Sequence, residues 1–262
     1  MCILLLSLRQ HPKFPLIVAA NRDEYYDRPT AVADFWEDAP DVLAGRDLLQ
    51  GGTWLGITQQ GRFAALTNFR DAESYRADRP SRGHLVSNFL LGDEPPDTYL
   101  SKIAEHADQY NGFSIIVGQM GTLSYYSNRE QQVHPLAPGV YGLSNHLLNT
   151  PWPKVTRGKQ EIGELLSETD GPTPEALFAT LTDGAIADDG ALPDTGIGLE
   201  KERLLSPLFI TGTDYGTRSS TVALIDNEGE VTFVERTFQR DPDEYTTVAH
   251  SFRITDRRQN AQ

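Results

Sequence analysis

The sequence predicts an α+β protein with four layers, in which two packed antiparallel sheets carry helices on their outer faces. Short apolar runs separated by turn residues dominate the chain, which is typical of antiparallel strands. Helical patterns occur in two pairs, each inserted between groups of strands, whereas a doubly wound parallel sheet would alternate single strands and helices. We find no linker and no internal repeat, so we expect a single domain over residues 1–254 and a polar tail over residues 255–262.

Strand patterns open the chain. Apolar runs at residues 3–8 and 16–20 are joined by a turn that contains Pro12 and Pro15. Three more strands are expected at residues 42–46, 53–58 and 63–69, with glycines at the turns between them. The Gly-Thr-Trp-Leu-Gly segment at 52–56 favours a hairpin over a phosphate-binding loop, because the lysine and the following helix of such a loop are missing.

A first pair of helices is expected next. Ser81 can cap a helix that runs to about residue 91 and ends at Gly92. The Pro-Pro-Asp sequence at 95–97 begins a second helix, through about residue 108, with apolar side chains on one face. Strands are then expected at residues 113–117, 123–126, 132–134 and 140–143.

A second pair of helices is expected in the second half of the chain, again followed by strands. Pro153 begins a helix to about residue 168, and Pro174 begins another to about residue 181. Residues 183–200 are rich in Gly, Asp and Pro and predict a long loop. The closing strands are expected at residues 208–211, 219–225, 231–238 and 245–253.

The composition restricts the classes of function. The chain of 262 residues is 39% hydrophobic and carries a net charge of −14, without a basic tract, which argues against nucleic acid and anionic membranes as partners. One cysteine cannot form an intramolecular disulfide, which fits a reducing compartment. The N-terminal apolar run is too short for a signal peptide, and no stretch approaches the roughly 18 apolar residues of a membrane helix. We therefore expect a soluble cytoplasmic protein.

The only cysteine, Cys2, is the first candidate for catalysis. It follows Met1, and cellular processing tends to remove the initiator methionine when the next residue is small. Removal would place a thiol (ordinary pKa about 8.5) and an α-amine (about 7.7–8.0) on one residue, which pairs a nucleophile with a base. A retained methionine would block the amine. The alternative is that Cys2 is a small apolar residue opening a buried strand.

A second candidate group is the Asn-Arg-Asp-Glu sequence at residues 21–24, directly after the second predicted strand. If the first two strands form a hairpin, the end of the second lies beside the start of the first, and Cys2 and Asp23 are neighbours. A carboxylate there can hold an α-ammonium group, and a guanidinium can stabilise a thiolate. The alternative is a charged surface turn.

Other polar residues give weaker signals. The six histidines are scattered without metal-ligand spacing, so we predict no metal site. The aspartates between residues 183 and 194 lack the calcium-loop pattern and indicate a solvated loop. Asn68 and Asn145 can be turn residues at strand ends, and Arg218 can pair with a core carboxylate.

The tetrapeptide at residues 21–24 resembles the signature of the NRDE family, which includes transport and Golgi organisation protein 2. Eight further blocks agree with that family in order along nearly the whole chain. They include Thr-Asn-Phe-Arg at 67–70 and Leu-Pro-Asp-Thr-Gly at 192–196, and the others lie at 51–56, 81–83, 110–113, 142–145, 150–154 and 215–220.

That family is in turn similar to cysteine N-terminal-nucleophile hydrolases, particularly the choloylglycine and penicillin amidases. This second resemblance implies the four-layer αββα sandwich that those enzymes share. It also implies a set of site residues: an initial cysteine, an arginine and an aspartate at a strand end, two asparagines that end later strands, and a late arginine beside a serine. The matching positions are Cys2, Arg22, Asp23, Asn68, Asn145 and Arg218.

The resemblance further implies an amidohydrolase, an acyl-thioester hydrolase or an acyltransferase that needs no cofactor. The amine of Cys2 would take the thiol proton, and the thiolate would attack an amide or thioester carbonyl. Asp23 would orient the amine, and Arg22 would favour the thiolate. The Asn145 side chain and the Asn68 backbone N–H would donate to the oxyanion. Arg218 would brace the site or bind a carboxylate.

The resemblance leaves a second function open, because members of the NRDE family are linked to haem trafficking and to acyl-coenzyme A or lipid handling. On this alternative the protein is a non-catalytic carrier whose ligand is haem or an acyl-CoA. Arg22, Arg70 or Arg218 would hold propionates or phosphates, and Cys2 would line the pocket or bind iron. A small molecule is the expected partner in both cases.

Overall fold

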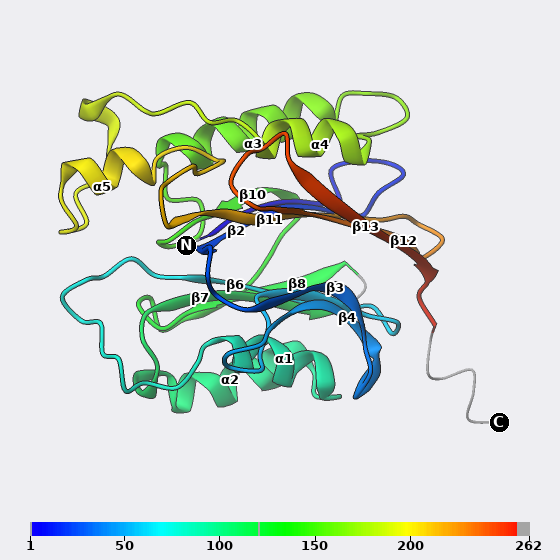
Figure 1. Ribbon diagram of the computed structural model, residues 1–262. Helices are drawn as coiled ribbons and strands as arrows, with labels where there is room; N and C mark the ends of the chain where they lie inside the picture. Colours follow the sequence, from blue (N-terminus) through cyan, green and yellow to red (C-terminus); the bar gives the residue numbers. More distant parts are fainter. Residues whose placement is uncertain (1, 120, 256–262) are drawn as a thin grey trace.

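The computed structural model describes residues 2–119 and 121–255. Two antiparallel sheets pack face to face, and a pair of helices covers the outer face of each sheet (Figure 1). The predicted four-layer αββα architecture is therefore confirmed. No helix among the described residues is long and apolar enough to cross a membrane.

The first sheet has six strands and contains both ends of the described chain. Its spatial order is β10-β1-β2-β11-β12-β13, and each neighbouring pair is antiparallel. Its strands are β1 (Cys2–Leu8), β2 (Leu16–Tyr25), β10 (Gly139–Leu143), β11 (Tyr215–Ile225), β12 (Glu230–Phe238) and β13 (Tyr245–Arg253).

The second sheet has seven strands that follow the chain in the order β3-β4-β5-β6-β7-β8-β9. Such a sheet needs only short connections except where the helical pair is inserted between β6 and β7. Its strands are β3 (Thr30–Trp36), β4 (Ala39–Asp47), β5 (Leu55–Thr58), β6 (Arg62–Asn68), β7 (Phe113–Gln119), β8 (Thr122–Ser127) and β9 (Val133–Pro135).

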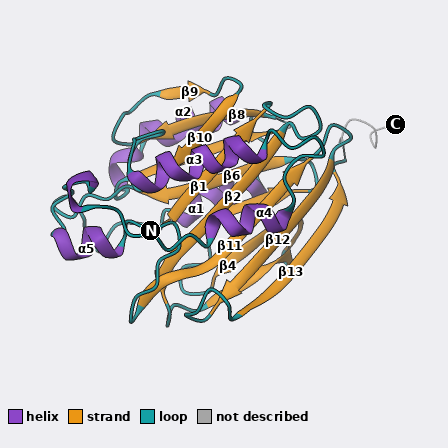
Figure 2. Ribbon diagram, turned by 90° about the horizontal axis from the view of Figure 1, so that it is seen from above, coloured by secondary structure: helices purple, strands orange, loops and turns teal. Residues whose placement is uncertain are grey.

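The helices form the two outer layers. The seven-stranded sheet is covered by α1 (Gly83–Leu91) and α2 (Pro96–Glu105), and the six-stranded sheet by α3 (Pro153–Leu165) and α4 (Pro174–Leu181), which lie across its strands in Figure 2. The helix α5 (Leu199–Leu204) lies beyond the strands, near the start of β1 (Figure 2). Short 3₁₀ turns occur at Ala107–Gln109 and Asp189–Ala191.

Strand β2 shows how the sequence builds these layers. Leu16, Val18 and Ala20 pack between the two sheets, whereas Ile17 and Ala19 pack against α3 and α4. Both faces are buried, so this part of the strand is continuously apolar. Because side chains alternate along a strand, the polar end of β2 continues the same division. Arg22 and Glu24 therefore lie on the face between the sheets, and Asn21 and Asp23 on the face toward the helices.

Two of the predicted element boundaries are wrong in ways that affect the site. Strand β2 continues to Tyr25, so the tetrapeptide at 21–24 lies inside a strand and is not a surface turn. The predicted strand at 208–211 forms only an isolated bridge between Thr211 and Gly216. Leu208 and Ile210 are buried, which accounts for the apolar run in the sequence, but they do not pair with a neighbouring strand.

Three further elements were not predicted. Strand β3 was missed, and the predicted loop at 183–200 contains a 3₁₀ turn and leads into α5. Of the predicted polar tail, residues 256–262 lie outside the described residues. Thr255 is described, and its backbone N–H donates to Gln59 O at 2.8 Å.

Candidate active site

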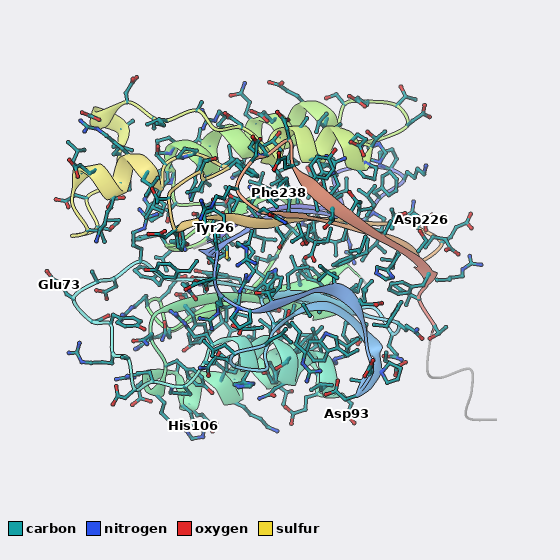
Figure 3. All side chains as sticks on the ribbon, in the orientation of Figure 1. Tyr26, Glu73, Asp93, His106, Asp226 and Phe238 are labelled. Atoms are coloured by element: carbon teal, nitrogen blue, oxygen red, sulfur yellow. The ribbon has the colours of Figure 1, made fainter. Side chains whose placement is uncertain are left out.

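Cys2 and Arg22 face each other across the β1–β2 pair, so both side chains lie between the two sheets. They line a cavity of about 270 Å³ at the end of the sandwich where β1 begins. The other walls come from the β4–β5 connection, the end of β6 and the segment that leads into α1. That last segment begins near Glu73, which is labelled at the same end of the molecule in Figure 3.

The thiol of Cys2 is held in its neutral form. Burial raises its pKa, and the carboxylate of Asp23 raises it further, while the backbone N–H of Asp23 and the guanidinium of Arg22 lower it in part. Ser144 Oγ donates to the carbonyl of Cys2 at 3.1 Å and fixes the start of the strand. A nucleophilic role for Cys2 therefore needs a nearby acceptor for the thiol proton.

Asp23 lies on the helix-facing side of β2 and is 2% exposed. Thr217 Oγ1 donates to its Oδ1 at 2.7 Å from the neighbouring strand β11, and Tyr215 donates its hydroxyl to the Asp23 carbonyl at 2.9 Å. Burial raises the pKa of the Asp23 carboxyl, whereas Lys154 and the Thr217 hydrogen bond lower it. Lys154 and Thr217 therefore both favour the ionised form of Asp23.

Lys154 is a buried cation behind Asp23, and in the sequence it stands out only as part of the family block at 150–154. It lies in the first turn of α3, is 1% exposed, and donates from Nζ to Leu205 O at 3.0 Å. Burial lowers its pKa to about 8, against the opposing effect of Asp23. The sequence did contain a signal, because residues 154, 158 and 162 share the buried face of the helix.

Asn145 connects the site to a second buried charge pair. Its Nδ2 donates to Asn68 O at 2.9 Å, and its own carbonyl accepts the Arg70 backbone N–H at 2.7 Å. The guanidinium of Arg70 is paired with Glu202 of α5. Glu202 in turn accepts hydrogen bonds from the backbone and the hydroxyl of Thr195, at 3.0 and 2.5 Å. Three of the family blocks, at 67–70, 142–145 and 192–196, thus meet behind Cys2.

The structure brings together four of the six residues implied by the resemblance. Cys2, Arg22, Asp23 and Asn68 all line the cavity. Asn145 is 0% exposed and lies behind Asn68 without lining the cavity.

Arg218 lies apart from this group. It is the extra residue of a β-bulge between Thr217 and Ser219, and it donates to Tyr25 O at 2.7 Å and Arg28 O at 3.2 Å. It therefore holds the turn that follows β2 and does not face the Cys2 cavity.

Arg82 also lines the cavity, although it was not among the predicted site residues. It precedes α1 as its N-cap residue, and Nη1 donates to Gly112 O at 2.8 Å. Burial lowers the pKa of its guanidinium. Its sequence signal was only the Ser-Arg-Gly block at 81–83. The described residues contain no group of three or more His, Cys, Asp or Glu side chains that could hold a metal ion.

Comparison with known proteins places this geometry in a family. The model of the family described as Transport and Golgi organisation 2 matches residues 1–240. The chain is 40% identical over 275 residues to the Transport and Golgi organization protein 2 homolog of Bos taurus, covering 97% of this chain and 99% of the relative. It is 36% identical to the Homo sapiens homolog, with the same coverage.

A solved structure shows the same fold at much lower sequence similarity. A mutant of the conjugated bile acid hydrolase from Clostridium perfringens superposes with a TM-score of 0.54 over 98% of both chains, at 8% identity. The fold is thus that of the N-terminal-nucleophile hydrolases. On the family match and the identity to its relatives, the chain belongs to the Transport and Golgi organisation 2 family.

Proposed function

We propose that the protein is a cysteine N-terminal-nucleophile hydrolase or acyltransferase that acts on amide or thioester bonds. The observation that carries this proposal is the position of Cys2, which lines a cavity together with Arg22, Asp23 and Asn68. The proposal includes the loss of Met1, because the reaction needs the free α-amine of Cys2 as a base.

The first chemical step moves one proton and forms one bond. The α-amine of Cys2, directly or through water, accepts the thiol proton, and the thiolate attacks the carbonyl carbon. Arg22 favours the thiolate, and Asp23 holds the resulting α-ammonium group. Collapse of the tetrahedral intermediate breaks the C–N or C–S bond, and the ammonium returns its proton to the leaving group. Water or another acceptor then releases the acyl group from the sulfur.

The end of β6 supplies a donor for the oxyanion. Leu66 donates its backbone N–H toward β5, to Trp54 O at 2.9 Å, and Phe69 donates in the opposite direction, to Gly112 O at 2.9 Å. N–H directions alternate along a strand, so the Asn68 N–H points to the side of β5, beyond the start of that strand at Leu55.

Asn145 was expected as a second donor, but it is buried behind Asn68 and does not line the cavity. In this proposal it holds the end of β6 in place, through the hydrogen bond from its Nδ2 to Asn68 O at 2.9 Å. Loss of one oxyanion donor typically raises a barrier by roughly 2.7–4 kcal/mol.

The test compares wild type with Cys2→Ala on panels of amides and acyl thioesters, after intact mass has established whether Met1 is absent. We expect turnover by the wild-type protein and only background hydrolysis by Cys2→Ala. Cys2→Ser is the matched variant, because it keeps the geometry with a weaker nucleophile. Equal turnover by wild type and Cys2→Ala would remove Cys2 from the mechanism.

Binding without turnover is the second candidate function, and the arginine-rich lining of the cavity favours it. Arg22, Arg28, Arg79 and Arg82 all line the cavity, and guanidinium groups recognise phosphates and carboxylates. An acyl-CoA or haem would then be carried rather than cleaved. The cavity, at about 270 Å³, lies just below the usual range of small-molecule sites and fits a part of such a ligand, which agrees better with an acyl group at a nucleophile.

Titration separates the two candidates. Haem and an acyl-CoA are added to wild type and to Cys2→Ala, and absorbance and product mass are followed. Tight binding with no product supports the carrier, and product formation that depends on Cys2 supports the enzyme.

A further inference from the structure

The cavity around Cys2 has an excess of guanidinium groups in a protein whose net charge is −14. Of its four arginines, Arg28 is neutralised, because it binds Asp47 at 2.7 Å and lies 3.7 Å from Glu24. Arg79 is exposed and donates to Tyr110 O at 3.3 Å. The remaining two are Arg22, which is buried, and Arg82, which is half-buried, and neither has a carboxylate closer than 4.0 Å in the described part of the chain.

Arg22 is the more buried of the two, with a side chain that is 6% exposed. Its guanidinium stacks over the ring of Trp54 at 4.3 Å, and its ion pair with Glu24 is stretched to 4.0 Å. Nη1 of Arg22 is buried and has no hydrogen-bond partner among the described residues. A buried donor of this kind costs free energy unless an acceptor reaches it. Because Arg22 lines the cavity, an acceptor that enters it can supply a partner for this guanidinium.

Arg82 approaches the same cavity from the segment before α1. Its Nη1 is used on Gly112 O, and it forms no ion pair with a carboxylate in the described part of the chain. Burial lowers the pKa of this guanidinium, as expected for a cation without a close counter-charge. Two arginines on different walls of one cavity thus retain hydrogen-bonding capacity and positive charge that the protein itself does not satisfy.

We propose that Arg22 and Arg82 form an anion-binding subsite beside Cys2, and that the ligands of this cavity are acyl compounds with a carboxylate or phosphate group near the reactive carbonyl. The acyl part of this statement rests on the proposed function, whereas the anion subsite does not. The planar fork of a guanidinium binds either group with two hydrogen bonds, and Trp54 holds the fork of Arg22 in place. A neutral acyl compound would leave both guanidinium groups without a close counter-charge.

Alkylation of the only cysteine tests the subsite without a known substrate. Iodoacetate and iodoacetamide both form a C–S bond and release iodide, but only iodoacetate carries a negative charge. Intact mass gives the rate at which each reagent alkylates Cys2, and the iodoacetate rate is divided by the iodoacetamide rate. This ratio is then divided by the same ratio measured for N-acetylcysteine. Changes in the pKa of the thiol affect both reagents equally and cancel in this ratio.

We expect the wild-type ratio to favour iodoacetate and to fall by about tenfold in Arg22→Met and in Arg82→Met, with a smaller preference at high salt. Arg22→Lys keeps the charge and is expected to retain most of the preference. The control is Arg46→Gln, whose guanidinium is paired with Asp38 outside this cavity. A ratio that is the same in wild type, Arg22→Met and Arg82→Met overturns the subsite.

Protection experiments identify the anion. Inorganic phosphate and acetate are added at equal ionic strength while iodoacetamide alkylates the wild-type protein. Slower alkylation with phosphate assigns a phosphate group to the ligand, slower alkylation with acetate assigns a carboxylate, and no protection by either overturns the subsite. Alkylation needs no turnover, so an anion-selective Cys2 in a protein that cleaves no acyl substrate would remove the proposed function and leave the subsite standing.

Discussion

Arg70 and Glu202 form an ion pair in which each side chain is only 4% exposed, although the two residues are 132 positions apart in the chain. The pair joins α5 to the backbone at Asn145 and, through it, to Asn68 at the cavity. A buried ion pair contributes little net stability compared with apolar residues, but removing one partner leaves an uncompensated charge. Comparing the loss of one partner with the loss of both therefore tests whether the Arg70–Glu202 pair holds the residues behind the cavity.

Single and double substitutions of this pair should not be additive. We expect Arg70→Met and Glu202→Met each to lower the free energy of unfolding by about 3–5 kcal/mol, and the double variant to be clearly more stable than the sum predicts. Urea denaturation measures all four proteins. Arg203→Met, which breaks the exposed contact with Asp189, is the control and should leave the midpoint unchanged. Additive losses would show that the two side chains do not act as a pair.

Gly52 lies where the β4–β5 connection touches the start of α1. A Cβ at this position would come within 2.5 Å of the Gly83 carbonyl carbon and 2.9 Å of the His84 nitrogen, both backbone atoms. We expect Gly52→Ala to lower stability by about 1–3 kcal/mol and to move the segment that carries Arg82.

The matched control for Gly52 is Gly163 in α3, where an added Cβ would meet nothing within 4 Å. Gly163→Ala should raise stability by about 0.5–1 kcal/mol, because it removes backbone entropy from the unfolded chain. Thermal unfolding of both variants measures the difference. Similar effects at the two positions would contradict the close approach at Gly52.

The elements that could be predicted from the sequence are those marked by a local pattern of apolar runs and turn residues. The apolar runs of β1 and β2, joined by a turn with two prolines, predicted their pairing, and this pairing places Cys2 opposite Arg22. Strand β3 escaped prediction because it is a half-exposed edge strand whose pairing with β4 is interrupted by two register shifts. Helix α5 escaped because Glu202 is held by Arg70 and Thr195 rather than by an apolar face.

The residues of the site also divide into those that could be selected from the sequence and those that only the structure shows. The resemblance supplied Asn68 and Asn145 as strand ends, and no local pattern would have placed one behind the other. Lys154 and Arg82 escaped because their importance comes from burial and from distant partners, which a sequence does not show directly. Arg218 was selected by resemblance, and the structure places it on the turn after β2.

Lys154 should control the pH at which the site becomes active, if Asp23 works as a carboxylate. Lys154 lowers the pKa of Asp23, so its removal favours the protonated acid. We expect Lys154→Met to shift the acidic limb of kcat/KM to higher pH and Lys154→Arg to keep it near the wild-type position. Thr217→Val removes a hydrogen bond that also lowers the pKa of Asp23, so it should shift the limb in the same direction.

The control for these profiles is Lys201→Met, on the exposed part of α5. It should leave the limb in place. A uniform loss of rate at every pH in Lys154→Met, with an unshifted limb, would assign Lys154 to packing alone.

Glu235 is a buried acid that links the two sheets. It is 2% exposed on β12, and its Oε1 accepts the backbone N–H of Ala33 in β3 at 2.7 Å. Its Oε2 accepts the hydroxyl of Thr221 at 3.1 Å. Burial raises its pKa from 4.5 to about 7, although these hydrogen bonds lower it in part. The folded state therefore holds the proton of Glu235 more tightly than the unfolded state does.

This difference makes stability depend on pH with a definite sign. Below about pH 4.5 the acid is protonated in both states, and as the pH rises toward about 7 only the unfolded state has released its proton, so folding becomes less favourable. The full loss, roughly 3 kcal/mol, is reached above pH 7. Glu235→Gln removes the titration, keeps an oxygen to accept the Ala33 N–H, and places an amide N–H that can donate to Thr221 Oγ1. Urea denaturation at pH 5 and pH 8 should therefore show a smaller loss than in wild type. The exposed Glu175→Gln is the control and should retain the wild-type dependence. Equal losses in wild type and Glu235→Gln would mean that Glu235 is already ionised in the folded protein at pH 5.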